Sequence, residues 1–246
     1  MFDLHSHILC GLDDGAESME EAEKMFARAG MNGIHTICAT SHYSRNVTAE
    51  KYNAAFDAAK VLAEKHGIDL LPGMEYDLCW MDSFPMDQIR TIGSSSCILV
   101  DMNQDYLVHS MVNLFFEFKL KGFKIIFAHP ERMLPPKELD KLMILLKEND
   151  IYIQVDTGSL VGRYGSLARS NAFRVMDAGG CHLLANDAHK ARHFLFPECK
   201  AIVENRYGKG VFELLTEENP KALFAGEDLI PSKPRKTFFQ RLFSRA

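Results

Sequence analysis

The chain has no long hydrophobic run, no paired cysteines and no excess of basic residues. No uncharged stretch reaches the roughly 18 residues that a membrane-spanning helix needs. Residues 1–5 show neither the basic nor the apolar region of a secretory signal. The six cysteines form no CxxC pair, which favours reduced thiols, and a net charge of -5 disfavours binding to nucleic-acid backbones. We therefore expect a cytoplasmic protein that binds no nucleic acid.

The composition is that of a globular α/β protein. The 246 residues are 47% hydrophobic and 25% charged, which suffices for one large domain with a substantial core. Short apolar segments alternate with amphipathic segments of helix length, as in a parallel sheet covered by helices. The expected strands are 2–8, 35–39, 70–75, 97–102, 124–128, 152–155 and 182–185. The expected helices are 18–31, 49–66, 106–121, 137–149, 166–178, 198–207 and 210–215.

Seven strand–helix repeats indicate an α/β fold with a closed parallel barrel related to the TIM barrel, and an open doubly wound sheet is the alternative. We assign this domain to residues 1–229 and a separate tail to residues 230–246. The tail holds five basic residues, no acidic residue and a group of phenylalanines. If it is helical, its apolar residues share one side and can lie in an anionic membrane surface. Packing on the barrel or on a second subunit, or simple disorder, are the alternatives.

Polar side chains that can bind metals follow the predicted strands at one recurring position. His5 and His7 are spaced i, i+2, as are Asp187 and His189, so each pair is expected to face one side. In a parallel barrel, the carboxyl ends of the strands converge on one mouth. Imidazoles and carboxylates gathered there suit a multinuclear site for zinc, manganese or iron. The candidate ligands are His5, His7, Asp14, His42, Glu75, Asp101, His129, Asp187 and His189.

The same residues carry a family resemblance. Residues 3–7 (Asp-Leu-His-Ser-His), 13–15 (Asp-Asp-Gly) and 40–42 (Thr-Ser-His) resemble the polymerase-and-histidinol-phosphatase (PHP) superfamily. The His-x-Glu-Arg motif at 129–132 and the Asp-Asp-Gly loop narrow the resemblance to the CpsB/CapC/YwqE-type bacterial tyrosine-protein phosphatases, over residues 1–229. The resemblance implies a distorted (β/α)7 barrel of the PHP type with three divalent metals. It also implies dephosphorylation of a phosphotyrosine-containing tail on a membrane tyrosine kinase of capsule or exopolysaccharide synthesis.

The resemblance also distributes the ligands among three metals. It implies that one metal is held by His5, His7, Glu75 and Asp187. Glu75 then bridges to a second metal, which His129 and Asp101 also hold. Asp14, His42 and His189 hold the third. Relatives usually carry Glu where this chain has Asp101, and the shorter side chain leaves the second metal's position or occupancy open.

For the reaction, we expect attack on phosphorus by a metal-bridging hydroxide, without a phosphoenzyme. Arg132 is expected to clamp the non-bridging phosphoryl oxygens with its planar guanidinium. Arg192, three residues after His189, is a second candidate, and a solvated loop arginine is its alternative interpretation. Two rival functions stay open. One is hydrolysis of a small phosphate monoester such as histidinol phosphate, and the other is non-catalytic regulation by binding to the kinase.

Overall fold

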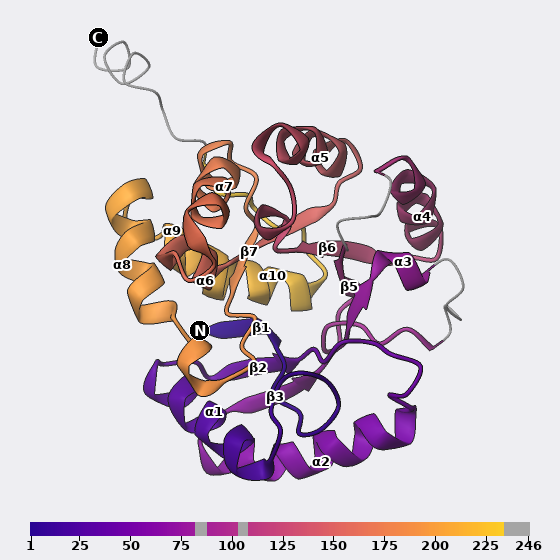
Figure 1. Cartoon of the computed structure of the whole chain (residues 1–246), viewed down its shortest axis with the longest axis vertical. Coiled ribbons are helices and arrows are strands. Elements are labelled where there is room, and N and C mark those ends of the chain that lie inside the picture. Colours follow the sequence, from indigo (N-terminus) through magenta and orange to yellow (C-terminus); the bar gives the residue numbers. More distant parts are fainter. Residues whose placement is uncertain (82–87, 103–107, 234–246) are drawn as a thin grey trace.

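Strands and helices alternate along the chain, which confirms the predicted α/β class (Figure 1). The computed structural model describes residues 1–81, 88–102 and 108–233. The strands are β1 (Phe2–Ser6), β2 (Thr36–Ala39), β3 (Asp69–Pro72), β4 (Glu75–Asp77), β5 (Cys97–Asp101), β6 (Lys124–Ala128), β7 (Tyr152–Asp156) and β8 (Leu183–Ala185). The longer helices are α1 (Met19–Met31), α2 (Ala49–Lys65), α4 (Val108–Leu120), α5 (Pro136–Glu148), α7 (Gly165–Asp177) and α8 (Phe196–Tyr207). Short ones are α3 (Leu78–Met81), η2 (Pro130–Arg132), α6 (Thr157–Val161), η3 (Ala191–His193), α9 (Val211–Glu213), η4 (Leu214–Glu218) and α10 (Asn219–Ala225).

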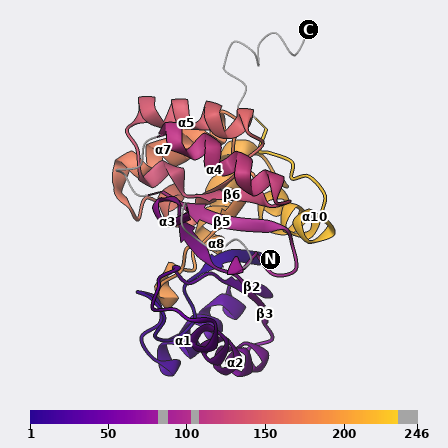
Figure 2. The same ribbon diagram turned by 90° about the vertical axis from the view of Figure 1, so that its right-hand side faces the viewer.

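The ladders form two parallel sheets, ordered β1-β2-β3 and β4-β5-β6-β7-β8. The three-stranded sheet lies with α1 and α2 in the lower part of Figure 1, and the five-stranded sheet lies above it, next to α4, α5 and α7 (Figures 1 and 2). Two isolated bridges connect the sheets. The bridge Ser6–Ala188 lies at the carboxyl end of β1, and the bridge His42–Glu75 lies beyond the carboxyl end of β2. The barrel is therefore distorted, because its ladders are interrupted twice and each interruption is crossed by one bridge.

The prediction of a single strand over 70–75 is wrong. β3 pairs with β2, whereas β4 pairs with β5 in the other sheet. Gly73 lies at the break, where a Cβ atom would come within 2.5 Å of Cys38 Sγ and 3.0 Å of Thr40 Cγ2. The backbone thus passes too close to β2 for any side chain at this position. Glu75 accordingly begins a strand instead of ending one.

Helix starts and ends follow the sequence signals closely. Ser18 caps α1, and its Oγ accepts a hydrogen bond from Glu21 N at 3.2 Å, as the capping box predicts. The Glu21 carboxylate accepts from Glu17 N instead of Ser18 N. The predicted helix 210–215 is interrupted, because α9 runs into a π-helical turn, η4, and then into α10. The start of the predicted helix 106–121 lies outside the described residues.

Two apolar clusters hold the strand ends in place. The larger cluster combines strand residues such as Phe127 with helix residues such as Phe26 and Phe115. The smaller one combines strand residues with Leu223 of α10 and with Leu229. Burial at roughly 25 cal/mol per Å² of apolar surface makes these clusters the main source of stability. They give the side chains beyond the strand ends a rigid support.

The chain remains attached to the body just beyond residue 229. Asn219 exchanges hydrogen bonds with the backbone of Ile230, and Ser232 N donates to Cys181 O at 2.6 Å. The predicted amphipathic segment after residue 233 lies outside the described residues. Among the described helices, none has both the length and the apolar character needed to cross a membrane.

Candidate metal centre

The candidate ligands gather where the two sheets meet. The register of β1 on β2 shifts between Asp3 and Ser6, and His5 lies within this irregularity. His5 Nε2 and His7 Nε2 lie 3.2 Å apart, so both imidazoles face one side, as their i, i+2 spacing predicts. Bridging of His42 to Glu75 brings the end of β2 to the start of β4. The residues that cross the sheet junctions are therefore themselves site residues or their direct neighbours.

Three overlapping groups of nitrogen and carboxylate atoms form within the described part of the chain. In each group the atoms lie within 4.8 Å of one another. Eight of the nine predicted ligands belong to these groups, and His5 and His7 each belong to two. The groups are His5, His7 and Asp187; His5, Glu75 and His129; and His7, Asp14, His42 and His189.

Neighbouring side chains orient the two central imidazoles. His5 Nδ1 lies 3.0 Å from Gln154 Oε1, and His7 Nδ1 lies 2.7 Å from Asp13 Oδ2. Asp13 also accepts a hydrogen bond from the backbone N–H of His42 at 2.8 Å. Because Nδ1 of each ring is engaged, Nε2 of each ring faces the centre. This second layer of contacts is typical of metal-ligating histidines.

The donor atoms fit divalent cations better than they fit one another. Glu75 Oε2 lies 3.0 Å from His42 Nδ1 and 3.2 Å from His5 Nε2, yet these contacts lack hydrogen-bond geometry. Asp187 Oδ1 is likewise buried without a well-formed hydrogen bond, although it lies 3.0 Å from His7 Nε2. Burying a carboxylate oxygen without a hydrogen bond lowers the stability of the folded protein. Cations placed between the facing atoms satisfy the oxygens and the ring nitrogens together.

Charge compensation in the protein alone depends on the histidines. Burial opposes ionisation of Glu75, but the surrounding imidazoles of His5, His129 and His42 hold its pKa well below the usual range. Burial likewise disfavours charged His5, yet Glu75 and Asp187 raise its pKa to about 9. His129 differs, because burial and the Arg132 charge lower its pKa to about 4. A bound cation would take over this compensation, since metal binding requires neutral imidazoles.

Two candidate ligands have a strained backbone. His129 has φ 36° and Asp187 has φ 44°, in the left-handed region that residues with a Cβ rarely adopt. Such conformations cost of order 1–3 kcal/mol each and persist where the surroundings enforce them. His129 directly follows β6, and Asp187 lies two residues beyond the end of β8. Their conformation turns the side chains toward the centre.

Exposure rises steadily across the site. The side chains of His5, His7 and Glu75 are fully buried, whereas those of His189, His42 and Asp14 are 20%, 42% and 71% exposed. The group around Asp14 therefore forms the entrance.

Arg132 lies beside the centre and is firmly held. Its Nη1 atom lies 2.7 Å from Asp187 Oδ2 and 3.1 Å from Asp156 Oδ2, and its guanidinium lies 4.8 Å from the centroid of the Tyr164 ring. Burial and the Arg132 charge act in opposite directions on Asp156, and its pKa rises to about 8. Arg132 thus touches a candidate metal ligand as well as facing the site, a contact that the sequence did not predict.

Arg192 lies on η3 with an exposed side chain. The adjacent His193 is buried, accepts a hydrogen bond from His189 N at 3.2 Å and contacts Arg163 Nη2. His193 therefore positions His189 from behind.

Asp101 is the candidate ligand that the three groups leave out. It ends β5, in register with Asp77 of β4. Burial and the nearby Glu75 charge raise its pKa to about 7. The residue is therefore close enough to sense Glu75 electrostatically, but its oxygens do not reach the ligand groups.

Several residues around the site were not predicted from the sequence. Asp13, Gln154 and Asp156 each contact a candidate ligand or Arg132, and buried Glu131 accepts a hydrogen bond from Asp156 N at 3.0 Å. Asp13 was recognisable only as part of the Asp-Asp-Gly loop, which does not tell the two aspartates apart. Pairing of β6 with β7 is what brings Gln154 and Asp156 to the site.

Fold and site together define a barrel-type α/β protein with overlapping groups of candidate metal ligands at its centre. The family model for capsular polysaccharide synthesis, CpsB/CapC, matches residues 1–225, and the chain belongs to this family. Tyrosine-protein phosphatase YwqE of Bacillus subtilis is 29% identical over 252 residues, which cover 99% of each chain. Tyrosine-protein phosphatase CpsB of Streptococcus pneumoniae is 22% identical, over 91% of this chain and 98% of the relative.

Solved structures agree with this assignment. A crystal structure from work on YwqE of Bacillus subtilis and CpsB of Streptococcus pneumoniae, described there as unique metal-dependent tyrosine phosphatases, superimposes with a TM-score of 0.83. It is 27% identical and covers 96% of this chain and 100% of its own. A lactonase from Listeria monocytogenes, 11% identical with a TM-score of 0.61, covers 91% of this chain and 94% of its own and shares the fold alone.

Proposed function

We propose that this protein is a metal-dependent protein tyrosine phosphatase. The observation that carries the proposal is the set of three overlapping ligand groups, open at one end and flanked by Arg132. Membership of the CpsB/CapC family and the names of the similar phosphatases support it. Cations bound by these ligands, together with Arg132, would supply the positive charge that a phosphate dianion needs in order to approach.

The pooled ligands of the three groups would hold three divalent cations, with zinc, manganese or iron as the candidates, and His5 and His7 would each give Nε2 to one cation. Bound cations supply a hydroxide nucleophile near neutral pH and neutralise the phosphoryl oxygens. His5 and His7, oriented by Gln154 and Asp13, would hold the buried cations in place. Asp101 would join the second group only after a small inward movement of its backbone or through a bridging water molecule.

Arg132 would bind the non-bridging oxygens of the phosphate. Both of its ion pairs use Nη1, and a guanidinium offers five N–H donors in a planar fork. Nε and Nη2 are the donors that we assign to phosphate. Asp156 and Tyr164 hold the guanidinium in a fixed orientation, which lowers the entropic cost of binding. Arg192, exposed on η3 close to His189, would make a second contact with the phosphate or the peptide.

The substrate would be a phosphotyrosine-containing tail of a membrane tyrosine kinase of capsule or exopolysaccharide synthesis. The entrance at Asp14 and His42 is exposed enough to admit a residue on a flexible chain. The leaving group is the tyrosine phenolate, whose conjugate acid has a pKa of about 10. Its protonation therefore matters less than that of an alkoxide released from an alkyl phosphate. Kinetics on a phosphotyrosine peptide and on histidinol phosphate test this choice. Preference for histidinol phosphate would favour the small-substrate alternative, and binding to the kinase without turnover would favour a regulator.

The basic tail would bring the enzyme to the inner face of the membrane, close to such a kinase. The five basic residues after residue 230 support this placement, since each adds about 1 kcal/mol of attraction to an anionic surface. Sedimentation with anionic vesicles compares the full chain with a chain ending at Pro231. Equal pelleting of both would contradict the membrane role and leave the phosphatase proposal intact.

A further inference from the structure

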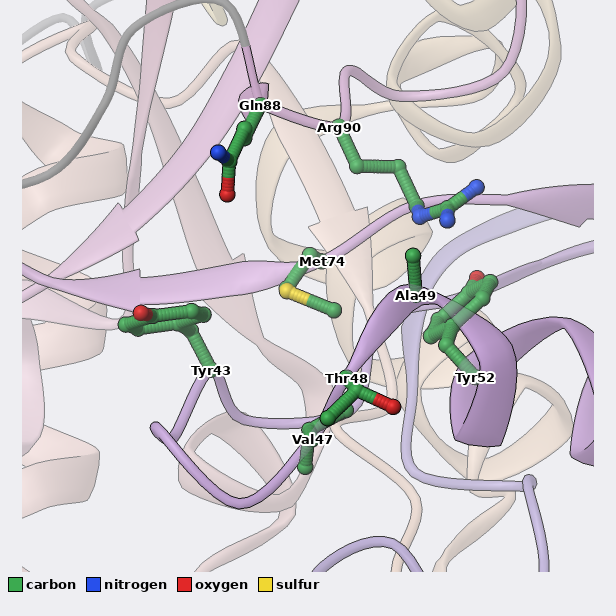
Figure 3. Close-up of a pocket in the computed structure, with 8 residues that line it drawn as sticks. All are labelled: Tyr43, Val47, Thr48, Ala49, Tyr52, Met74, Gln88 and Arg90. Carbon is green, nitrogen blue, oxygen red and sulfur yellow. The ribbon is translucent and has the colours of Figure 1, made fainter.

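A pocket with a volume of about 230 Å³ lies between residues 43–52, which lead into α2, and the segments that carry Met74, Gln88 and Arg90 (Figure 3). Its lining includes Tyr43, Val47, Ala49, Tyr52, Met74 and Arg90. Figure 3 shows Met74 between the rings of Tyr43 and Tyr52, with Arg90 above Tyr52. The members of the three ligand groups do not line it. The pocket is therefore separate from the metal centre.

One wall nevertheless serves both sites. Tyr43 follows His42, Met74 precedes Glu75, and Tyr43 N donates to Glu75 O at 2.8 Å. Successive side chains of an extended segment point to opposite faces. His42 and Glu75 thus face the metal centre, while Tyr43 and Met74 face the pocket. A peptide that crosses this wall would place one residue at the metal centre and another residue in the pocket.

The lining favours an aromatic occupant over an aliphatic one. The Tyr43 ring can stack against an aromatic group, the Met74 sulfur can contact a ring edge favourably, and the Arg90 cation can attract a ring face. Arg90 already lies 3.9 Å from the centroid of the Tyr52 ring. Its backbone N–H donates to Tyr76 Oη at 2.7 Å, and its Nη2 donates to Asn53 Oδ1 at 3.2 Å. The guanidinium is therefore fixed at the pocket before any ligand arrives.

The volume fits one ring. A cavity of about 150 Å³ is enough to bind benzene, whereas pockets for drug-sized ligands start near about 300 Å³. At about 230 Å³, this pocket accepts a phenyl or phenol side chain with its Cβ, and little more.

We propose that this pocket binds an aromatic side chain that flanks the phosphotyrosine of a peptide substrate. The inference rests on the proposed phosphatase function and adds a specificity site to it. An extended peptide advances about 3.3 Å per residue, so a residue two or three positions from the phosphotyrosine reaches across the wall. The pocket thereby selects which tyrosine of a substrate enters the metal centre.

The test uses metal-loaded full-length enzyme and pairs of phosphotyrosine peptides that differ only by Phe or Ala at one flanking position. Each position from three before to three after the phosphotyrosine is examined. At one of them we expect the Phe peptide to have a roughly tenfold lower KM, equivalent to about 1.4 kcal/mol. The kcat stays the same, because this contact is made equally in the ground and transition states. p-Nitrophenyl phosphate serves as a substrate without flanking residues.

Two variants locate the effect in the pocket. Ala49→Phe places a ring in the pocket from an exposed position in the first turn of α2. Ala58→Phe adds the same group to an exposed position of the same helix, about 13 Å farther along. We expect Ala49→Phe to abolish the preference for Phe and Ala58→Phe to retain it. Both variants should hydrolyse p-nitrophenyl phosphate like the wild type.

The outcomes separate the two proposals. Equal KM values for every peptide pair, with active wild-type enzyme, would overturn the pocket proposal and leave the phosphatase intact. If Ala49→Phe impairs p-nitrophenyl phosphate as strongly as the Phe peptide, the pocket holds the ring of the leaving group, which also overturns the proposal. Failure of the metal-loaded wild type to hydrolyse any of these substrates would refute the phosphatase function itself.

Discussion

Replacing Gly15 by alanine should disable the site, although Gly15 is not itself a candidate ligand. A Cβ atom at residue 15 would lie 2.0 Å from the carbonyl oxygen of His7 and 2.6 Å from its Cβ. Real Cβ atoms hardly ever lie closer than 3.0 Å to such an atom. The Cβ atom and the His7 carbonyl oxygen would therefore have to move apart by at least 1.0 Å, from 2.0 Å to 3.0 Å. The obstacle is backbone, so no rotation of a side chain relieves it. The loop has to move away from His7.

The loop carries two aspartates that would move with it. Asp13 accepts a hydrogen bond from Gly15 N at 3.0 Å and lies 2.7 Å from His7 Nδ1. Asp14 Oδ1 lies 3.3 Å from His189 Nε2. Misplacement by about 1 Å costs on the order of 100-fold in turnover. Overpacking adds a loss of about 1–3 kcal/mol in the free energy of unfolding.

Gly11→Ala is the matched control for this loop. Gly11 has φ +73° with open space around the position, so alanine there costs about 1–2 kcal/mol of backbone strain without a clash. Both variants should therefore lose similar stability in urea unfolding, but only Gly15→Ala should lose kcat/KM on a phosphotyrosine peptide and metal content by elemental analysis. Wild-type activity and metal content in Gly15→Ala would show that the contact between the loop and His7 does not position the ligands.

Four further outcomes are expected. Chelation should abolish phosphatase activity, and manganese, zinc or iron should restore it; activity that survives thorough chelation would contradict a metal mechanism. Arg132→Ala should lower kcat about 100-fold or more while elemental analysis still finds the metals, whereas loss of metal would assign Arg132 to holding Asp187. Asp101→Ala should lower metal content and activity, and Asp101→Glu should keep or raise them; a fully active, fully loaded Asp101→Ala would end the ligand role of this residue. Burial lowers the pKa of His182 to about 4, and its Nδ1 accepts a hydrogen bond from Ile153 N at 3.1 Å. Because the folded-state pKa lies below the unfolded value, stability is complete above about pH 6.5 and falls by up to about 3 kcal/mol as the pH falls toward 4. Urea unfolding of His182→Gln across this range should show a flatter dependence than the wild type.

Local sequence signals predicted most elements and the place of the site. A short apolar run located β6 over Lys124–Ala128 without error, and Ser18 marked the start of α1. The i, i+2 spacing of His5 and His7 predicted that both rings face one side. Each of these features depends on neighbours in the sequence, so the chain alone is sufficient to reveal it.

Features that depend on how distant segments meet were not predictable. The break between β3 and β4 lies where Gly73 passes close to Cys38 of β2, a contact between residues 35 positions apart. The sharing of His5 and His7 between ligand groups follows from the approach of Asp187 and Glu75 across the sheet junctions. The position of Asp101 at the end of β5 was predicted correctly. Its carboxylate oxygens nevertheless lie too far from the three ligand groups to belong to them.

The metal centre lies where the backbone ladders are weakest, and this has a consequence for stability. One bridge at Ser6–Ala188 and one at His42–Glu75 connect the two sheets. The candidate ligands come from both sides: His5, His7 and His42 from the three-stranded sheet, and Glu75, His129 and Asp187 from the five-stranded sheet or its loops. Cations held between them would link the sheets at the points where few backbone hydrogen bonds do so. Binding to the folded state alone stabilises by RT ln(1 + [L]/Kd), about 2.7 kcal/mol for each site at a hundredfold excess over Kd. The same ligands thus serve both the chemistry and the cohesion of the barrel, so removing the metals should loosen the junction between the sheets as well as stop turnover.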